Sequence, residues 1–283
     1  MSCPDCFSGS TRESVALRGT VSTIHGLKAY ISEPTSGRPI RGIIVIIPDA
    51  FGFDFVNNHV LADHYAEKGD YRVYLPDFML GYSAPVWLLD TMKELHTGKN
   101  ILTKPLHILW AIYGVVPWIL RNRIGRSYPI VERFFGELRK AEGATLPIGV
   151  AGFCWGGKHA LLLAQGAKFD GLTLIDAAFT GHPSMVKLPD DVVNLKQPVS
   201  FAIGDRDTQI TLEKAREVEA LLAQFPESQA SELRIYGDTG HGFCVRADIT
   251  AGESESAKRA GEAEDQCIDW FNRHLQPRLS RTA

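Results

Sequence analysis

A cysteine between glycines is the strongest chemical signal in this 283-residue chain. Residues 149–153 form an apolar run typical of a strand, which ends in Gly152-Phe153-Cys154-Trp155-Gly156-Gly157 and leads into residues 158–165, which favour a helix. A strand that turns sharply into a helix needs small residues beside the turn, because the two elements approach closely there. The pattern predicts a nucleophile elbow with Cys154 at its apex, near the positive end of the helix. The alternative is a buried structural cysteine followed by a glycine-rich turn.

A cysteine nucleophile needs a base, and His241 is the candidate. It lies between two glycines in a loop that follows the predicted strand 233–237. In an α/β-hydrolase, the acid and then the histidine follow the nucleophile along the chain. A doubly wound sheet presents its site in loops at the carboxyl ends of the strands. The order and the position therefore predict that His241 is the base for Cys154.

The acid that orients His241 has three candidates. Asp205 and Asp207 follow the predicted strand 198–204, and Asp176 ends an expected strand at residues 172–175. We prefer Asp207. Asp205 lies closer to the strand end, however, and Asp176 could supply the acid by a different route, so both stay open.

These motifs resemble the dienelactone hydrolase family, a cysteine branch of the α/β-hydrolases. The resemblance covers roughly residues 20–275, and its most specific parts are the elbow, residues 204–207 and residues 240–243. It implies that Cys154 is the nucleophile, Asp207 the orienting acid and His241 the base. The backbone N–H groups of Trp155 and of Ala50, which follows the predicted strand 42–47, would hold the oxyanion.

Substrate contacts implied by the resemblance differ from those of the bacterial members. Asp49 stands where those members carry a glutamate that holds the resting thiol, and Gly81 stands near where an arginine would grip a substrate carboxylate. Arg246 matches a second arginine of this kind, one residue later. We therefore expect a neutral or apolar ester or lactone rather than a dianionic dienelactone.

Two segments look like the fungal members of the family. They are residues 3–6, with Cys3 and Cys6, and residues 177–184, which include His182 as an expected substrate-binding residue. This likeness points toward secondary metabolism. Two other functions stay open: a thioesterase or polyketide-processing hydrolase, and a catalytically idle α/β-hydrolase that only binds a ligand.

An apolar insertion interrupts the regular pattern at about residues 85–126. Its core, residues 106–120, contains a proline and a glycine and is too short to cross a bilayer, which needs about 20 apolar residues. One interpretation is a lid whose Trp110 and Trp118 wall the pocket above Cys154. The others are a helix pair packed on the sheet and, less favoured, a peripheral membrane contact.

The rest of the chain alternates predicted strands and helices, which predicts an α/β fold with a mostly parallel, doubly wound sheet. Further strands are expected at residues 27–33 and 71–75, and helices at residues 60–68, 130–140, 159–165, 212–224 and 256–275. We expect one α/β-hydrolase domain over residues 21–283, with the lid-like insertion, after a loosely ordered segment 1–20.

Composition limits the partners. A net charge of −3 gives no basic field for nucleic acid, and five cysteines in a chain of this length favour a reducing compartment, so the cytoplasm is expected. Cys3 and Cys6 have the spacing of a zinc knuckle, but no second pair completes four ligands, and we expect neither a metal nor an organic cofactor. The expected partner is a small-molecule ester or lactone, and the oligomeric state is left open.

Overall fold

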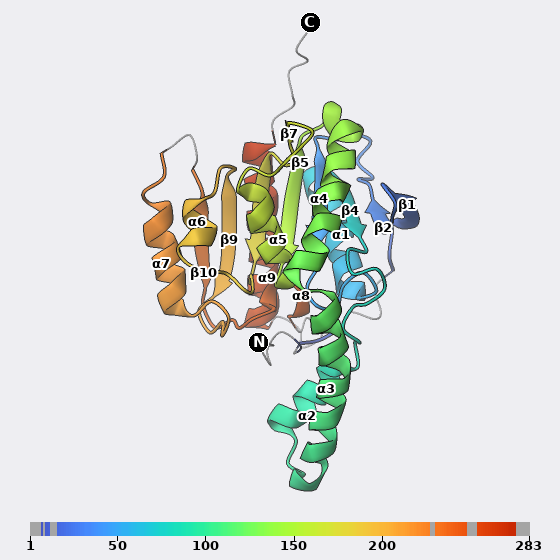
Figure 1. The fold of residues 1–283 in the computed structure, drawn as a ribbon, viewed down its shortest axis with the longest axis vertical. Coiled ribbons are helices and arrows are strands. Elements are labelled where there is room, and N and C mark those ends of the chain that lie inside the picture. Colours follow the sequence, from blue (N-terminus) through green and yellow to red (C-terminus); the bar gives the residue numbers. More distant parts are fainter. Residues whose placement is uncertain (1–6, 8, 12–15, 227–229, 248–253, 276–283) are drawn as a thin grey trace, which may run out of the picture.

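An eight-stranded sheet in the order β1-β2-β4-β3-β5-β8-β9-β10 forms the centre of the computed structural model, which describes residues 7, 9–11, 16–226, 230–247 and 254–275 (Figure 1). The edge strand β1 (Thr20–Ile24) pairs antiparallel with β2 (Leu27–Ser32), and β2 also pairs antiparallel with β4 (Arg72–Pro76). All other pairs are parallel; they join β4, β3 (Ile43–Ile47), β5 (Ile148–Phe153), β8 (Ala177–Gly181), β9 (Val199–Gly204) and β10 (Glu232–Tyr236). The predicted α/β-hydrolase fold is confirmed.

Helices cover both faces of this sheet. One face carries α1 (Val56–Gly69), α8 (Phe243–Arg246) and α9 (Glu255–His274), and the other carries α4 (Ile124–Lys140), α5 (Trp155–Ala164), α6 (Asp190–Val193) and α7 (Leu212–Leu222) (Figure 1). Strands covered on both sides are expected to be apolar without alternation. Every residue of β3, β5, β8 and β9 is buried accordingly.

The expected sheet strand at residues 172–175 is wrong. Only Leu172–Thr173 is extended there, as β7, and it pairs with β6 (Lys168–Phe169) in a separate two-stranded ribbon. The sheet strand is β8, one segment later, whose small residues Ala177 and Ala178 give a weak strand signal. Asp176 therefore precedes a sheet strand instead of ending one. The edge strand β1 was also missed, because its side chains are mostly exposed.

The insertion forms a helical hairpin, made of α2 (Leu88–Thr97), a short 3₁₀ turn (Ile101–Thr103) and α3 (Lys104–Arg121). Figure 1 shows the hairpin projecting from the body on the side where the parallel strands end. It does not lie on the sheet, so that interpretation is wrong. Gly114 of α3 lies against Trp87 and Leu88, where an added Cβ would come within 2.8 Å of the Trp87 ring, so the two helices pack closely on each other. Among the described helices, none is long and apolar enough to cross a membrane.

Two described residues of the N-terminal segment, Phe7 and Ser10, pack on the body. The Phe7 ring is buried and contacts the Phe51 ring edge-on, with centroids 6.1 Å apart. The backbone N–H of Ser10 donates to the carbonyl oxygen of Arg246 at 3.1 Å. Cys3 and Cys6 lie outside the described residues.

Candidate active site

Cys154 occupies a sharp turn between β5 and α5. Its backbone has φ 51° and ψ −112°, and residues other than glycine rarely adopt such a positive φ. A Cβ on Gly156 would lie 2.0 Å from the Ile47 carbonyl oxygen, and one on Gly152 would lie 2.4 Å from the Gly156 carbonyl oxygen. Because neither position has room for a side chain, the two glycines permit the turn. The side chain of Cys154 is buried at its apex.

His241 and Asp207 meet beside this turn. His241 follows β10 and Asp207 follows β9, and the two strands are parallel neighbours. Nδ1 of His241 lies 3.0 Å from Oδ2 and 3.1 Å from Oδ1 of Asp207, and both side chains are fully buried. The backbone N–H groups of Gln209 and Ile210 donate to Asp207 Oδ1 at 2.7 and 3.1 Å. These donors fix the carboxylate in the orientation that accepts the Nδ1 proton of His241.

The two other acid candidates have different partners. Asp205 Oδ1 accepts a hydrogen bond from the backbone N–H of Thr239 at 3.1 Å. Asp176 pairs with buried Arg139 at 2.8 Å and accepts from the backbone N–H of Ile148, at the amino end of β5. The structure thus brings Asp207 to His241, and it places Asp176 at the opposite end of the sheet.

The charge at Cys154 governs the protonation of His241. Burial alone would lower the pKa of His241, but a negative charge on neighbouring Cys154 and the hydrogen bond with Asp207 raise that pKa to about 10. With Nδ1 directed at Asp207, Nε2 is the nitrogen left for a proton that moves to or from Cys154.

Two backbone N–H groups lie next to the turn, in Trp155 and Ala50. Trp155 is the first residue of α5, and Ala50 belongs to the loop after β3. A hydrogen bond of 3.2 Å from the Gly156 N–H to the Pro48 carbonyl oxygen ties these segments together. Within the described part of the chain, neither the Trp155 nor the Ala50 N–H donates a hydrogen bond. Both donors are therefore available to a group bound beside Cys154.

Asp49 is engaged by Arg246. The two side chains form a buried ion pair, and Asp49 Oδ1 also accepts from the Phe51 N–H at 3.2 Å. Burial raises the pKa of Asp49, the positive charge of Arg246 opposes this, and a negative charge on Cys154 adds to the rise. Arg246 is thus bound to an internal carboxylate.

Ser184 contacts the sulfur, and sequence reasoning missed it. Its Oγ lies 3.8 Å from Cys154 Sγ, and its backbone N–H donates to the Cys154 carbonyl oxygen at 3.0 Å. The residue belongs to the segment 177–184, whose resemblance to fungal members was the one available signal.

His182 lies in the core beside His241. The two rings are edge-to-face, with centroids 5.1 Å apart, and the Phe153 and Phe243 rings complete its surroundings. Burial and the positive charges of His241 and Arg246 lower the pKa of His182 well below its usual value, so its ring is neutral. Neither ring nitrogen has a partner among the described residues. His182 is fully buried.

The interpretation of Trp110 as part of a lid above Cys154 is wrong. That ring packs with Trp87 and Tyr113 inside the projecting hairpin, with centroids 5.7 and 5.8 Å away, because α3 is held against α2 and directed away from the body. Trp118 lies at the hairpin base instead, where it contacts the Phe7 ring at 5.5 Å and donates to Met79 Sδ at 3.4 Å. Next to this base, residues from 78–82 and 121–130 line a cavity of about 190 Å³.

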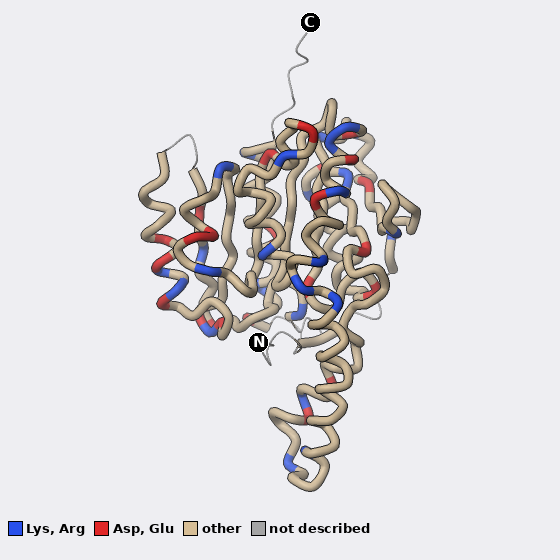
Figure 2. Tube along the Cα trace, viewed as in Figure 1, with Lys and Arg blue, Asp and Glu red and all other residues tan. Residues whose placement is uncertain are grey.

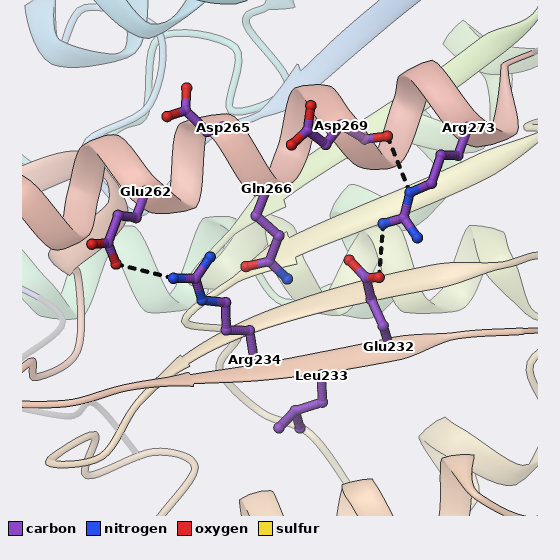
Figure 3. A pocket seen from close by; sticks show the side chains of 8 residues that line it. All are labelled: Glu232, Leu233, Arg234, Glu262, Asp265, Gln266, Asp269 and Arg273. Atoms are coloured by element: carbon purple, nitrogen blue, oxygen red, sulfur yellow. Dashed lines mark hydrogen bonds and ion pairs between the residues drawn. The ribbon is translucent and has the colours of Figure 1, made fainter.

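A larger hollow lies elsewhere. This pocket has a volume of about 470 Å³ and lies between β10 and α9, where it is lined mainly by charged side chains (Figure 3). Those side chains pair with one another, Arg234 with Glu262 at 3.1 Å and Arg273 with Glu232 at 2.7 Å. It contains none of the residues gathered around Cys154.

A buried Cys-His-Asp cluster at the strand ends of this sheet is typical of an α/β-hydrolase. Comparisons with known proteins show the family. The model of the dienelactone hydrolase family matches residues 128–275, and the chain belongs to this family. Hydrolase tropI of Talaromyces stipitatus is 30% identical over 273 residues, which cover 96% of both chains. Hydrolase pyvD of Aspergillus violaceofuscus is 27% identical, again with 96% of both chains covered.

Relatives with lower sequence identity indicate the same family. The human carboxymethylenebutenolidase homolog is 26% identical, with 96% of this chain and 97% of that protein covered. The crystal structure of a dienelactone hydrolase described as putative, from Klebsiella pneumoniae, superposes with a TM-score of 0.63 at 17% identity, and covers 92% of this chain and all of that one. This protein is a hydrolase of the ester and lactone type.

Proposed function

We propose that Cys154, His241 and Asp207 form a catalytic triad that hydrolyses an ester or lactone through a thioester intermediate. The observation that supports it most is the contact of 3.0 Å between His241 and Asp207, beside a cysteine held at a sharp strand-to-helix turn. An acid fixed by backbone donors orients the base, and the base serves the nucleophile.

The proposed reaction has two halves. The Cys154 thiolate attacks the substrate carbonyl carbon, a C–S bond forms, and the N–H groups of Ala50 and Trp155 hold the oxyanion. Collapse breaks the C–O bond, and His241 gives its Nε2 proton to the leaving oxygen. His241 then removes a proton from water, which attacks the thioester and releases the carboxylic acid and the thiolate.

We also propose that the substrate is neutral or largely apolar and belongs to fungal secondary metabolism. Gly81 offers no cation, and the Arg246 guanidinium is already paired with Asp49. Binding would then depend on apolar burial, at about 25 cal/mol per Å². The similarity to the two fungal hydrolases supports the metabolic setting.

Intact mass spectrometry tests the triad. After incubation with an activated aryl ester, we expect one acyl adduct on the wild-type protein, none on Cys154→Ala, and wild-type behaviour for Cys244→Ala, because Cys244 is buried and its pKa is raised well above its usual value. Cys154→Ser should keep a weak activity, since a hydroxyl is harder to deprotonate. Ligand binding without any adduct or turnover would instead indicate an idle binding protein, and a strong preference for carrier thioesters would indicate a thioesterase.

A further inference from the structure

Ser184 contacts the sulfur of Cys154, but the proposed mechanism gives it no role. Ser184 Oγ lies 3.8 Å from Cys154 Sγ, within reach of a hydrogen bond to sulfur, and both residues are buried. In a buried site, water does not compete for such a contact, and the low dielectric constant strengthens it. The contact therefore bears on the charge that the sulfur can carry.

The backbone holds Ser184 at this place. Strand β8 is the direct neighbour of β5, so the segment after β8 runs past the turn at Cys154. The Ser184 N–H donates to the Cys154 carbonyl oxygen at 3.0 Å, and the Cys154 N–H donates to the Gly181 carbonyl oxygen at 3.2 Å. His182 before it and Met185 after it have φ of 38° and 57°, which is strained for residues other than glycine. Such strain persists only where the surroundings fix it, and here it accompanies a hydroxyl brought to the sulfur.

The charged groups around Cys154 act in opposite directions on a thiolate. Charged residues are spread over the body and are few on the hairpin (Figure 2), and those next to Cys154 belong to the body. The buried Asp49 carboxylate and a negative charge on Cys154 disfavour each other, and Arg246 of α8 offsets part of this. Protonated His241, in the loop after β10, favours the thiolate. A buried thiolate also needs donors that add no charge, and Ser184 is such a donor.

The direction of the hydrogen bond depends on whether the sulfur holds a proton. A thiol can donate to the serine oxygen. A thiolate has no proton to give, so the hydroxyl, which rotates about its C–O bond, has to donate to the sulfur. A hydrogen bond to a charged atom is about twice as strong as one between neutral groups. The contact therefore stabilises the thiolate more than the thiol, and lowers the pH at which the nucleophile forms.

We propose that the Ser184 hydroxyl donates a hydrogen bond to the Cys154 thiolate and is a further catalytic group of this site. The inference rests on the proposed function, in which the thiolate first attacks the substrate and later leaves the thioester. Ser184 keeps its proton throughout, and His241 carries the proton that is transferred. In the thioester the sulfur is neutral, so the hydrogen bond weakens there and strengthens again as the C–S bond breaks. Ser184 thus favours both the formation of the nucleophile and its departure.

Acylation kinetics at different pH values test this role. With an activated aryl ester in a stopped-flow instrument, release of the phenol gives the acylation rate. Ser184→Ala should acylate about tenfold more slowly at low pH and approach the wild-type rate at high pH, because its thiolate forms about one pH unit higher. Ser184→Thr keeps the hydroxyl and should keep the wild-type profile.

Ser200→Ala is the matched control. It removes a buried hydroxyl that donates to Glu232 at 2.9 Å, near the amino end of β9 and away from the site, so the profile should not change. A Ser184→Ala rate that is lower by the same factor at every pH would indicate a structural role and overturn the proposal. A Ser184→Thr variant with the alanine profile would overturn it as well.

Two further measurements separate this inference from the proposed function. The acyl adduct of Ser184→Ala should last longer in intact mass spectra, since a more basic thiolate leaves more slowly. The ultraviolet absorbance of the thiolate, taken as the difference from the same protein with Cys154→Ala, gives the titration midpoint without a substrate. If the wild type forms no acyl adduct, the proposed function fails, and this titration still tests the hydrogen bond. An unchanged midpoint in Ser184→Ala would overturn the role of Ser184 alone.

Discussion

At the carboxyl ends of β5, β9 and β10, titratable side chains are buried, whereas on α3 large apolar side chains are exposed. His241 is 7% exposed and Asp207 3%, but Tyr113 is 68% and Leu109 64% exposed. Each region departs from the usual distribution of residues between core and surface. At the strand ends, partners within the same chain compensate the buried charges. On α3, contacts such as that of the Tyr113 ring with the Trp87 ring, whose centroids are 6.5 Å apart, cover the apolar side chains only in part, and these side chains stay exposed.

The buried cluster lies within one chain, since Asp207 contacts His241 and the backbone N–H groups of Ala50 and Trp155 lie in segments next to Cys154. The base of the hairpin contacts this cluster, where the Trp155 indole donates to the Asn122 carbonyl oxygen at 2.8 Å. Changes at the strand ends should therefore affect turnover, and changes along α3 beyond its base should leave turnover unchanged.

Replacement of Asp207 should have the largest effect. We expect Asp207→Asn to lower kcat about ten-thousandfold, as in serine triads, because the amide no longer selects the tautomer of His241 that serves Cys154. Asp205→Asn is the matched control and should stay within about tenfold, since Asp205 binds only the Thr239 N–H. Steady-state kinetics with an aryl ester measure both. A greater loss in Asp205→Asn would show that the acid has been misassigned.

Replacement of Arg246 should show how much the buried ion pair with Asp49 matters for the free energy of unfolding. Arg246→Ala leaves the Asp49 carboxylate buried and unpaired, and should lower the free energy of unfolding by about 3–5 kcal/mol. Arg234→Ala breaks a half-exposed pair with Glu262 and should change it by less than about 1 kcal/mol. Urea denaturation gives both values. Asp49→Asn/Arg246→Ala should recover part of the loss, and equal losses in the two single variants would contradict the argument.

Replacement of Cys154 should shift the titration of His241. Cys154→Ser removes the negative charge that raises the His241 pKa, so that pKa should fall from about 10 by about 1–3 units. Because His241 binds its proton more tightly when folded, this contribution to stability is full below about 6.5, the ordinary pKa, and is lost as pH rises toward 10. In Cys154→Ser, this contribution to stability should be lost at a lower pH than in the wild type.

NMR titration of the His241 ring measures this shift. Cys267→Ser is the control, because Cys267 lies on α9, outside the cluster, and its replacement should leave the His241 pKa unchanged. An unchanged pKa in Cys154→Ser would mean that the sulfur carries no charge next to His241.

Replacement of Trp118 and of Trp110 should have the smallest effects. The two changes compare the base of the hairpin with a position farther along α3. Trp118→Ala should raise KM for a bulky aromatic ester several-fold, because Trp118 packs on Phe7 at the hairpin base. Trp110→Ala should leave KM unchanged, since its ring contacts only hairpin residues among the described aromatic pairs. Comparison with an acetyl ester separates loss of pocket contacts from loss of folding. An equal effect of both changes would restore the lid interpretation.

Local sequence patterns predicted most of the fold. Uninterrupted apolar runs predicted β3, β5 and β9 to within one or two residues, because strands covered on both faces need apolar side chains throughout. The elbow was predictable for a similar reason, since Gly152 and Gly156 are required wherever a strand and a helix approach so closely. The short strand β8 was missed because its small residues carry no strong preference of their own.

The sequence by itself determined the fold class, the turn at Cys154 and the order of acid and histidine after it, because each depends on neighbours along the chain. Only the tertiary structure decided that Asp207 and not Asp205 reaches His241, since a two-residue difference within one loop is resolved by where β9 and β10 end side by side. It also decided that Arg246 turns inward to Asp49 and that α3 leaves the body. Those outcomes depend on packing between residues that are distant in the sequence, which no local pattern specifies.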